Sequence, residues 1–205
     1  METLSRLMNL CAVPIMVLNL FGDVASGIWL AVLGEWGAIG YGIVAIVFSG
    51  FLLGFAFAPS MLIAMPGVKL AERGYRAPMY FFGFLSRGYD TMVIIIWVTI
   101  VFSAFLNRTS DASAVIPTLI WSYGVATAPI MWLASKEDRN SPNGFTAFVT
   151  TFFTQLGCLV LTIVAIIAGS FTVGLLAFIG VMLVSLFTSF AISVAMQQEI
   201  GHGAA

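Results

Sequence analysis

Charged residues are scarce in this sequence. Of its 205 residues only 8% are charged, while 60% are hydrophobic and the mean hydropathy is +1.06. A soluble domain carries roughly a quarter of its residues charged, so water is the wrong solvent for most of this surface. The Lys and Arg residues are scattered and the net charge is -1, which leaves no basic face for nucleic acid. Composition therefore excludes a soluble domain and a nucleic-acid partner.

Histidine and cysteine are almost absent. The single histidine, His202, lies in the polar C-terminal tail. A single histidine in the tail cannot supply the histidines that paired-histidine haem sites, zinc-protease helices and His-dependent triads require. Cys11 and Cys158 each lie inside an apolar stretch, where we expect packing residues and not a disulfide. We therefore expect no cofactor and no metal site.

Long apolar runs fill most of the chain. A hydrocarbon core about 30 Å thick requires about 20 apolar residues per helix. Turn and charged residues divide this sequence into six such runs. The pattern predicts an all-α polytopic membrane helix bundle in which residues 1–205 form a single transmembrane domain, inserted in a plasma or bacterial inner membrane. The expected spans are residues 10–33, 36–65, 79–106, 112–133, 145–168 and 171–196.

The distribution of Lys and Arg predicts the orientation of the bundle. Basic residues concentrate on the cytoplasmic side of membrane proteins. An even number of spans with both termini cytoplasmic places only Arg108 outside. The basic residues then on or near the inner side are Arg6, Lys69, Arg73, Arg76, Arg87, Lys136 and Arg139.

Asp23 is the sharpest polar signal, because it lies within the first span. An ionisable group at the bilayer centre costs about 2.5–3.5 kcal/mol on insertion scales. Asn19, Asp23 and Gly27 recur at every fourth residue and share one helix face. The carboxylate is either an ion, proton or substrate site or a structural group bonded to a neighbouring helix. We expect it to face the interior, where Arg87 or Asp90 is its partner or a hydrated cavity surrounds it.

A second charged pair lies in the third span. Arg87 and Asp90 are three residues apart, so they can pair on one helix face. Residue counting places Asp90 and Asp23 at similar depth. Two acids and one Arg leave a surplus negative charge, which suits a cation or a proton. The structural alternative is that Arg87 extends to the interface and Asp90 only accompanies it.

The fifth and sixth spans carry small polar residues at helical spacing. In the fifth span these residues are Thr146, Thr150, Thr154, Cys158 and Thr162. Serines follow the same spacing at 185, 189 and 193 in the sixth span. Such stripes are typical of packing seams between membrane helices, so we expect a tight antiparallel hairpin. The alternative is the wall of a polar path, to which Thr154 and its neighbour Gln155 would contribute.

Two tetrapeptides carry a resemblance to a family of enzymes. They are Leu-Phe-Gly-Asp at 20–23 and Arg-Gly-Tyr-Asp at 87–90. Each resembles the Gly-x-Gly-Asp and Tyr-Asp motifs of presenilin-like and prepilin peptidases. The resemblance covers eight residues and implies an intramembrane aspartyl protease that uses Asp23 and Asp90. Neither tetrapeptide has both glycines, and Arg87 next to Asp90 favours full ionisation where such pairs share a proton.

The leading hypothesis is a small transporter or channel subunit that passes a cation, a proton or a small polar solute. Its path would be lined by the first, third and fifth helices. Asp23 would bind the cation or accept the proton, and Asn19 would be a neutral ligand. Asp90 would be a second acid, with Arg87 balancing its charge. The sequence thus favours a non-enzymatic protein over an enzyme.

The remaining alternative is a non-catalytic assembly or scaffold subunit. Its polar groups would only pack against partner chains. Gly50, Gly54 and Ala58 form a ridge of small residues that would serve a homo-oligomer or a membrane complex. The stretches 29–41 and 121–129 match no motif whose chemistry is known.

Overall fold

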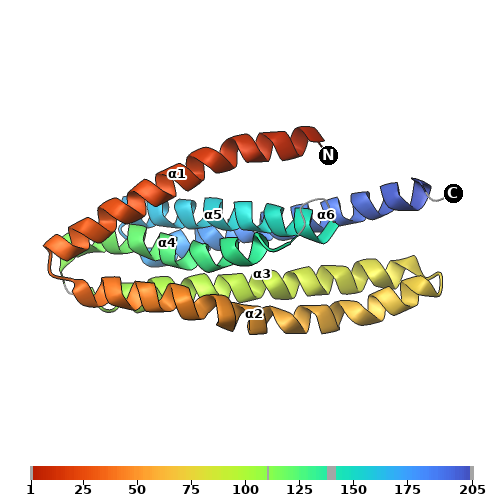
Figure 1. Cartoon of the computed structure of the whole chain (residues 1–205), viewed down its shortest axis with the longest axis horizontal. Coiled ribbons are helices and arrows are strands. Elements are labelled where there is room, and N and C mark those ends of the chain that lie inside the picture. The colour runs from red at the N-terminus through yellow and green to blue at the C-terminus, as the bar shows by residue number, and fades with distance from the viewer. Residues whose placement is uncertain (1, 110, 138–141, 204–205) are drawn as a thin grey trace.

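The structure is a computed structural model that describes residues 2–109, 111–137 and 142–203. All regular structure in these ranges is helical, and six of the helices are long and apolar enough to cross a membrane (Figure 1). The predicted all-α bundle is confirmed, and the chain is an integral membrane protein. The elements are α1 (Glu2–Val32), α2 (Trp36–Glu72), α3 (Arg76–Leu106), the short 3-10 helix η1 (Ala112–Ala114), α4 (Val115–Ala134), α5 (Pro142–Ala168) and α6 (Phe171–Gly203).

Three glycines end helices in the left-handed conformation. Gly34, Gly74 and Gly169 have φ values of 78°, 91° and 61° and follow α1, α2 and α5. After Gly34, the N–H of Glu35 donates to the carbonyl oxygen of Leu30 at 2.9 Å, and corresponding bonds close the other two ends. Glycine adopts this conformation without a steric penalty, and the bonds satisfy carbonyls that the helix leaves free. The breaks predicted at 34–35 and 169–170 are confirmed.

The second span is longer than its sequence predicted. We expected it to end at Met65, before Pro66, but α2 continues to Glu72. The reason is packing against α3 around the buried Gly67. A Cβ at Gly67 would lie 2.9 Å from the Cβ of Phe82, so the two backbones approach closely. This contact offsets the hydrogen bond that the proline removes.

Helix α4 forms the centre of the bundle and α1 its periphery. In the most apolar stretch of α4, 67% of the residues are buried, against 11% in α1. Four other helices, α1, α2, α3 and α5, pack against α4. Its buried Val125 and Ala126 join Phe102 and Phe105 of α3 in the main core. Helix α1 diverges from the other helices toward its N-terminus (Figure 1).

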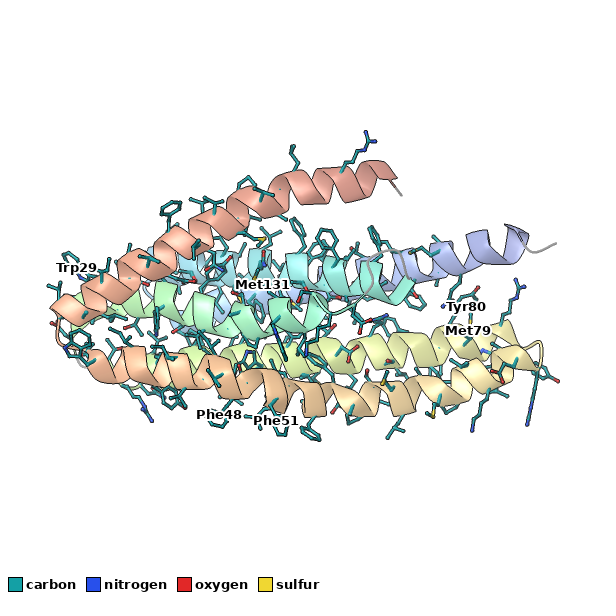
Figure 2. The ribbon with its side chains drawn as sticks, in the orientation of Figure 1. Trp29, Phe48, Phe51, Met79, Tyr80 and Met131 are labelled. Carbon is teal, nitrogen blue, oxygen red and sulfur yellow. The ribbon has the colours of Figure 1, made fainter. Side chains whose placement is uncertain are left out.

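Much of the outer surface is apolar. On α2, Phe48 and Phe51 are exposed and point away from the bundle (Figure 2). Exposed aromatic side chains cost nothing when the surrounding solvent is hydrocarbon. This surface is therefore the expected boundary with lipid.

Helices α5 and α6 form the predicted antiparallel hairpin. The hydroxyl oxygens of Thr150 and Ser189 are 3.2 Å apart across the seam. Thr154 also donates to the sulfur of Met182 at 3.9 Å. Thr154, Ser185 and Ser189 are buried, so these members of the two stripes face protein and not lipid. The packing interpretation of the stripes is confirmed.

Both termini lie at one end of the bundle, together with the α2–α3 and α4–α5 turns (Figure 1). This end carries the basic residues of those turns, including Lys136, whose ammonium lies 3.6 Å from the centre of the Trp132 ring. Arg139 lies outside the described residues. The opposite end carries Arg108 and Asp111, where the backbone N–H of Ser113 donates to Asp111 and lowers the pKa of this exposed carboxyl. The side of the membrane that each end occupies stays a prediction.

Close packing of the hairpin predicts opposite effects for two Gly→Ala changes in α6. A Cβ at Gly174 would lie 2.6 Å from the carbonyl oxygen of Leu161, whereas a Cβ at Gly180 meets no atom within 4 Å. Gly174→Ala should therefore destabilise the protein by about 1–3 kcal/mol. Gly180→Ala should be neutral or stabilising by up to about 1 kcal/mol. Thermal unfolding in detergent measures both, and equal effects would contradict the close contact.

The charge asymmetry predicts which end is cytoplasmic. Single cysteines at Glu137 and Glu35, in a chain carrying Cys11→Ala, mark the two ends, while Cys158 is fully buried. An impermeant thiol reagent applied to intact cells should label position 35 and should reach position 137 only after permeabilisation. The reverse pattern would invert the orientation.

Candidate polar site between α1, α4 and α5

Asp23 lies against the backbone of α4. Its carboxylate occupies the space next to Gly124, where an added Cβ would collide with both carboxylate oxygens. Glycine at this position therefore allows the acid to approach the helix axis. The Oδ1 atom of Asp23 is buried and has no hydrogen-bond partner among the described residues. The expectation that Asp23 faces the protein interior is confirmed.

Asn19 lies one turn from Asp23 and contacts the same helix. Its Nδ2 atom donates to Oγ1 of Thr127 at 3.3 Å, and this hydroxyl in turn donates to the carbonyl oxygen of Tyr123 at 2.9 Å. The Oδ1 atom of Asn19 is buried and without a partner in the described part of the chain. The α1–α4 contact is thus polar over two turns, as the i, i+4 spacing predicted.

Tyr123 completes this group of side chains. It lies near Asp23 and near Cys158 of α5. Its side chain is buried, and its hydroxyl has no hydrogen bond to any residue that the structure describes. We call Asn19, Asp23, Tyr123 and Thr127 the α1–α4 polar site. Each unsatisfied buried polar atom costs about 1–3 kcal/mol, so the site is well suited to bind water, an ion or a polar group.

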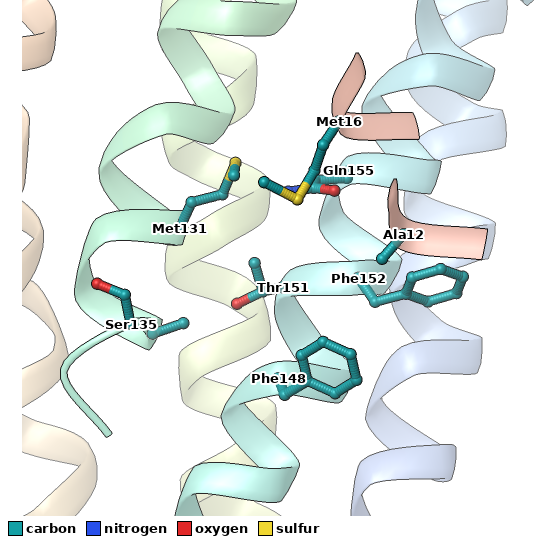
Figure 3. Close-up of a pocket in the computed structure, with 9 residues that line it drawn as sticks. Ala12, Met16, Met131, Ser135, Phe148, Thr151, Phe152 and Gln155 are labelled. Carbon is teal, nitrogen blue, oxygen red and sulfur yellow. The ribbon is translucent and has the colours of Figure 1, made fainter. Parts of the chain in front are cut away.

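A pocket opens between α1, α4 and α5 (Figure 3). It lies near the start of α1 and the end of α4, because Ala12 and Ser135 line it. Its volume is about 170 Å³. The lining is mostly apolar, with Ala12 and Met16 from α1, Met131 and Ala134 from α4, and Phe148 and Phe152 from α5. Ala12 and Met16 precede Asn19 on α1, and Met131 follows Thr127 on α4. The pocket therefore adjoins the α1–α4 polar site along the same helix contact.

Gln155 lies in this pocket and Thr154 does not. Gln155 is only 3% exposed, and it lines the pocket together with Met16 and Met131 (Figure 3). Thr154 points to α6, where it donates to Met182 and belongs to the hairpin seam. Of the two predicted path residues on α5, only Gln155 lies on the side of α1 and α4.

Arg87 and Asp90 form a separate cluster between α2, α3 and α5. Arg87 donates from Nη2 to Oγ1 of Thr146 at 2.7 Å and lies 3.9 Å from the Asp90 carboxylate. The side chain of Ser60 on α2 also faces Asp90. The Oδ1 atom of Asp90 is buried and has no partner among the described residues. The predicted i, i+3 pair is confirmed, and the structure adds Thr146 as a partner from α5.

The predicted meeting of Asp23 with Arg87 or Asp90 is wrong. Helix α1 packs mainly on α4 and makes almost no contact with α3. The reason is that Gly124 gives α4 a face flat enough to receive Asp23. The α1–α4 polar site therefore lies between the first and fourth helices, next to the fifth, whereas the sequence predicted a path lined by the first, third and fifth.

Sequence reasoning missed the α4 half of the site. Tyr123, Gly124 and Thr127 lie in the stretch 121–129, which matched no motif. One signal was present, because the fourth span has the lowest mean hydropathy of the six, 1.4, although it is the most buried. An apolar environment around a less apolar helix indicates that its polar groups face other helices.

Comparison with protein families, with curated proteins and with solved structures finds no match for this chain. The fold and the apolar surface define its class, an all-α integral membrane protein with six helices long enough to span the bilayer.

The contact between Asp23 and Gly124 predicts an energetic coupling. Gly124→Ala should destabilise the chain by about 1–3 kcal/mol, because the added methyl group displaces the carboxylate. In an Asp23→Ala background the same change should cost less, with a coupling energy of about 0.5–3 kcal/mol. Gly88→Ala in α3 is the matched control, since a Cβ there meets no atom within 4 Å. Thermal unfolding of the wild type, the two single variants and the double variant measures the cycle, and additive effects would contradict the contact.

Proposed function

We propose that the protein is a small membrane transporter or channel subunit that passes a proton, a cation or a small polar solute past Asp23. The observation that carries the proposal is the α1–α4 polar site. Buried oxygen atoms of Asn19, Asp23 and Tyr123 gather at one helix contact without hydrogen-bond partners among the described residues. Ionisable groups inside membrane spans generally mark ion, proton or substrate pathways.

The charges of the site favour a cation or a proton over an anion. Asp23 is the only charged member of the α1–α4 polar site. Arg87, the basic residue that lies within the third span, interacts instead with Asp90 and Thr146. A carboxylate flanked by amide, phenol and hydroxyl oxygens offers the hard oxygen ligands that cations prefer. The same groups can relay a proton through hydrogen bonds.

The position of the site at the periphery supports participation of α1 or of a second copy. Helix α1 is the least buried helix, and its main packing contact is with α4. A path that crosses the membrane would form when α1 moves or when another chain covers this side. On α2, Gly54 and Ala58 of the predicted ridge lie exposed and are available for an oligomer contact, whereas Gly50 is buried against Trp132 of α4.

The intramembrane protease alternative lacks a supporting geometry. Its mechanism requires two carboxylates close enough to share a proton. Asp23 contacts Gly124 of α4, whereas Asp90 lies beside Arg87 and Ser60. The scaffold alternative predicts no flux through the isolated protein, whereas the transporter hypothesis predicts measurable flux.

Replacement of Asp23 by Asn tests the transport function. Asp23→Asn keeps the shape of the side chain and removes its charge, so flux should fall to the background of empty vesicles. Asp111→Asn is the matched control, because this carboxyl is exposed outside the spans, and it should keep the wild-type rate. Proton, Na⁺ and K⁺ fluxes in proteoliposomes provide the readout, with oligomer size and unfolding temperature measured in parallel.

Two results would overturn the proposal. One is a wild-type rate in the Asp23→Asn variant, and the other is a wild-type protein that passes neither ions nor small solutes such as urea. Cleavage of a membrane peptide that depends on both Asp23 and Asp90, without flux, would support the protease instead.

A further inference from the structure

The pocket between α1, α4 and α5 has one polar group available for a ligand. Its other two polar members use their hydroxyl donors within their own helices. Ser135 donates to the carbonyl oxygen of Trp132 at 2.7 Å, and Thr151 donates to that of Ala147 at 2.8 Å. The amide of Gln155 has no hydrogen bond among the described residues, although the side chain is 97% buried. It offers two donors and one acceptor to whatever occupies the pocket.

The rest of the lining is apolar and adaptable. Met16 and Met131 line the pocket together with Gln155 (Figure 3), and Phe148 and Phe152 line it from α5. Methionine side chains are flexible and polarisable, and they fit differently shaped apolar ligands. Apolar walls with a few convergent polar groups are the usual construction of a small-molecule site.

The pocket lies near the ends of its three helices, between Ala12 of α1 and Ser135 after α4. It lies where α1 diverges from α4 and α5 toward the N-terminus (Figure 1). Phe148 and Phe152 are only partly buried, although they lie within the fifth span. The volume of about 170 Å³ holds about five or six groups of the size of a water molecule. A short apolar chain with one polar end fits these dimensions.

We propose that this pocket binds a neutral amphiphile, an apolar chain or ring with a single amide, carbonyl or hydroxyl group, and that Gln155 recognises the polar group. The ligand is either a free lipophilic molecule or part of a membrane lipid, since both present the same chemistry. The proposal is independent of flux past Asp23. A protein that passes no ion would still bind the amphiphile.

Methionine NMR tests binding at this site directly. The protein carries ¹³C-methyl methionine in detergent, and hexanamide is the probe, with hexane and acetamide as comparisons. Hexanamide should shift the Met16 and Met131 signals in a saturable way. Met61, which is 73% exposed on α2, should show no saturable shift. Hexane and acetamide should each bind at least about tenfold more weakly, because each lacks one half of the recognised chemistry.

A pair of Gln→Leu variants separates recognition from general apolar binding. Gln155→Leu should weaken hexanamide binding about tenfold and abolish the preference for the amide over hexane. Gln198→Leu, at an exposed position of α6, should leave both unchanged. Titration before and after removal of copurified lipid distinguishes the two sources of ligand, because affinity rises after lipid removal only when a lipid occupies the pocket.

Three outcomes would overturn the proposal. The first is the absence of any saturable shift of Met16 and Met131 in the wild-type protein. The second is equal affinity for hexane and hexanamide, which indicates a purely apolar cavity. The third is equal affinity for acetamide and hexanamide, which indicates a hydrated vestibule. All three readouts come from wild-type protein and do not depend on the folding of a variant.

Discussion

The structure depends on the absence of water in the bilayer core. Each backbone N–H and C=O in hydrocarbon must be hydrogen-bonded within the protein. An α-helix satisfies these groups with hydrogen bonds inside its own segment. The spans of this chain are accordingly unbroken helices, and the close turns at Gly34, Gly74 and Gly169 satisfy carbonyls at the helix ends. The same constraint applies to side chains. Trp97 and Trp121 direct their indole N–H groups to the carbonyl oxygens of other helices, at 3.0 and 3.3 Å.

Association of these helices then relies on close approach, because lipid tails are as apolar as the helix surfaces. Small residues provide that approach at each main contact. Gly67 brings α2 to α3, Gly124 brings α1 to α4, and Gly174 brings α6 to α5. Of these three glycines, only Gly124 leaves a space that receives an ionisable side chain. Gly124 therefore permits two features of the structure: the packing of α1, the most peripheral helix, on α4, and the burial of Asp23.

Most of the fold could be predicted from the sequence, because apolar length and glycine turns are local properties. The end of α2 could not be, since packing around Gly67 overrides Pro66. The interior placement of Asp23 followed from the cost of charge in lipid. The partner of Asp23 could not be predicted, because the sequence of a helix that is apolar on all sides does not indicate which neighbouring helix each face contacts. Gly124 carries no polar group and so gave no sign that it would receive the carboxylate.

The two intramembrane acids, Asp23 and Asp90, therefore differ in the charges of the residues around them. Asp90 has a cation one turn away, and the Arg87 guanidinium also bonds to Thr146, so its charge is balanced within a junction of three helices. The described residues around Asp23 are neutral, and Asp23 lies at the edge of the bundle. In the proposed function, the proton or cation that neutralises Asp23 also changes the free energy with which α1 docks on α4, because the carboxylate and the helix contact share the Gly124 surface. By linkage, movement of α1 changes the affinity of Asp23 for that proton or cation by the same factor. The proposed site is thus coupled to the docking of α1, the least buried of the described spans.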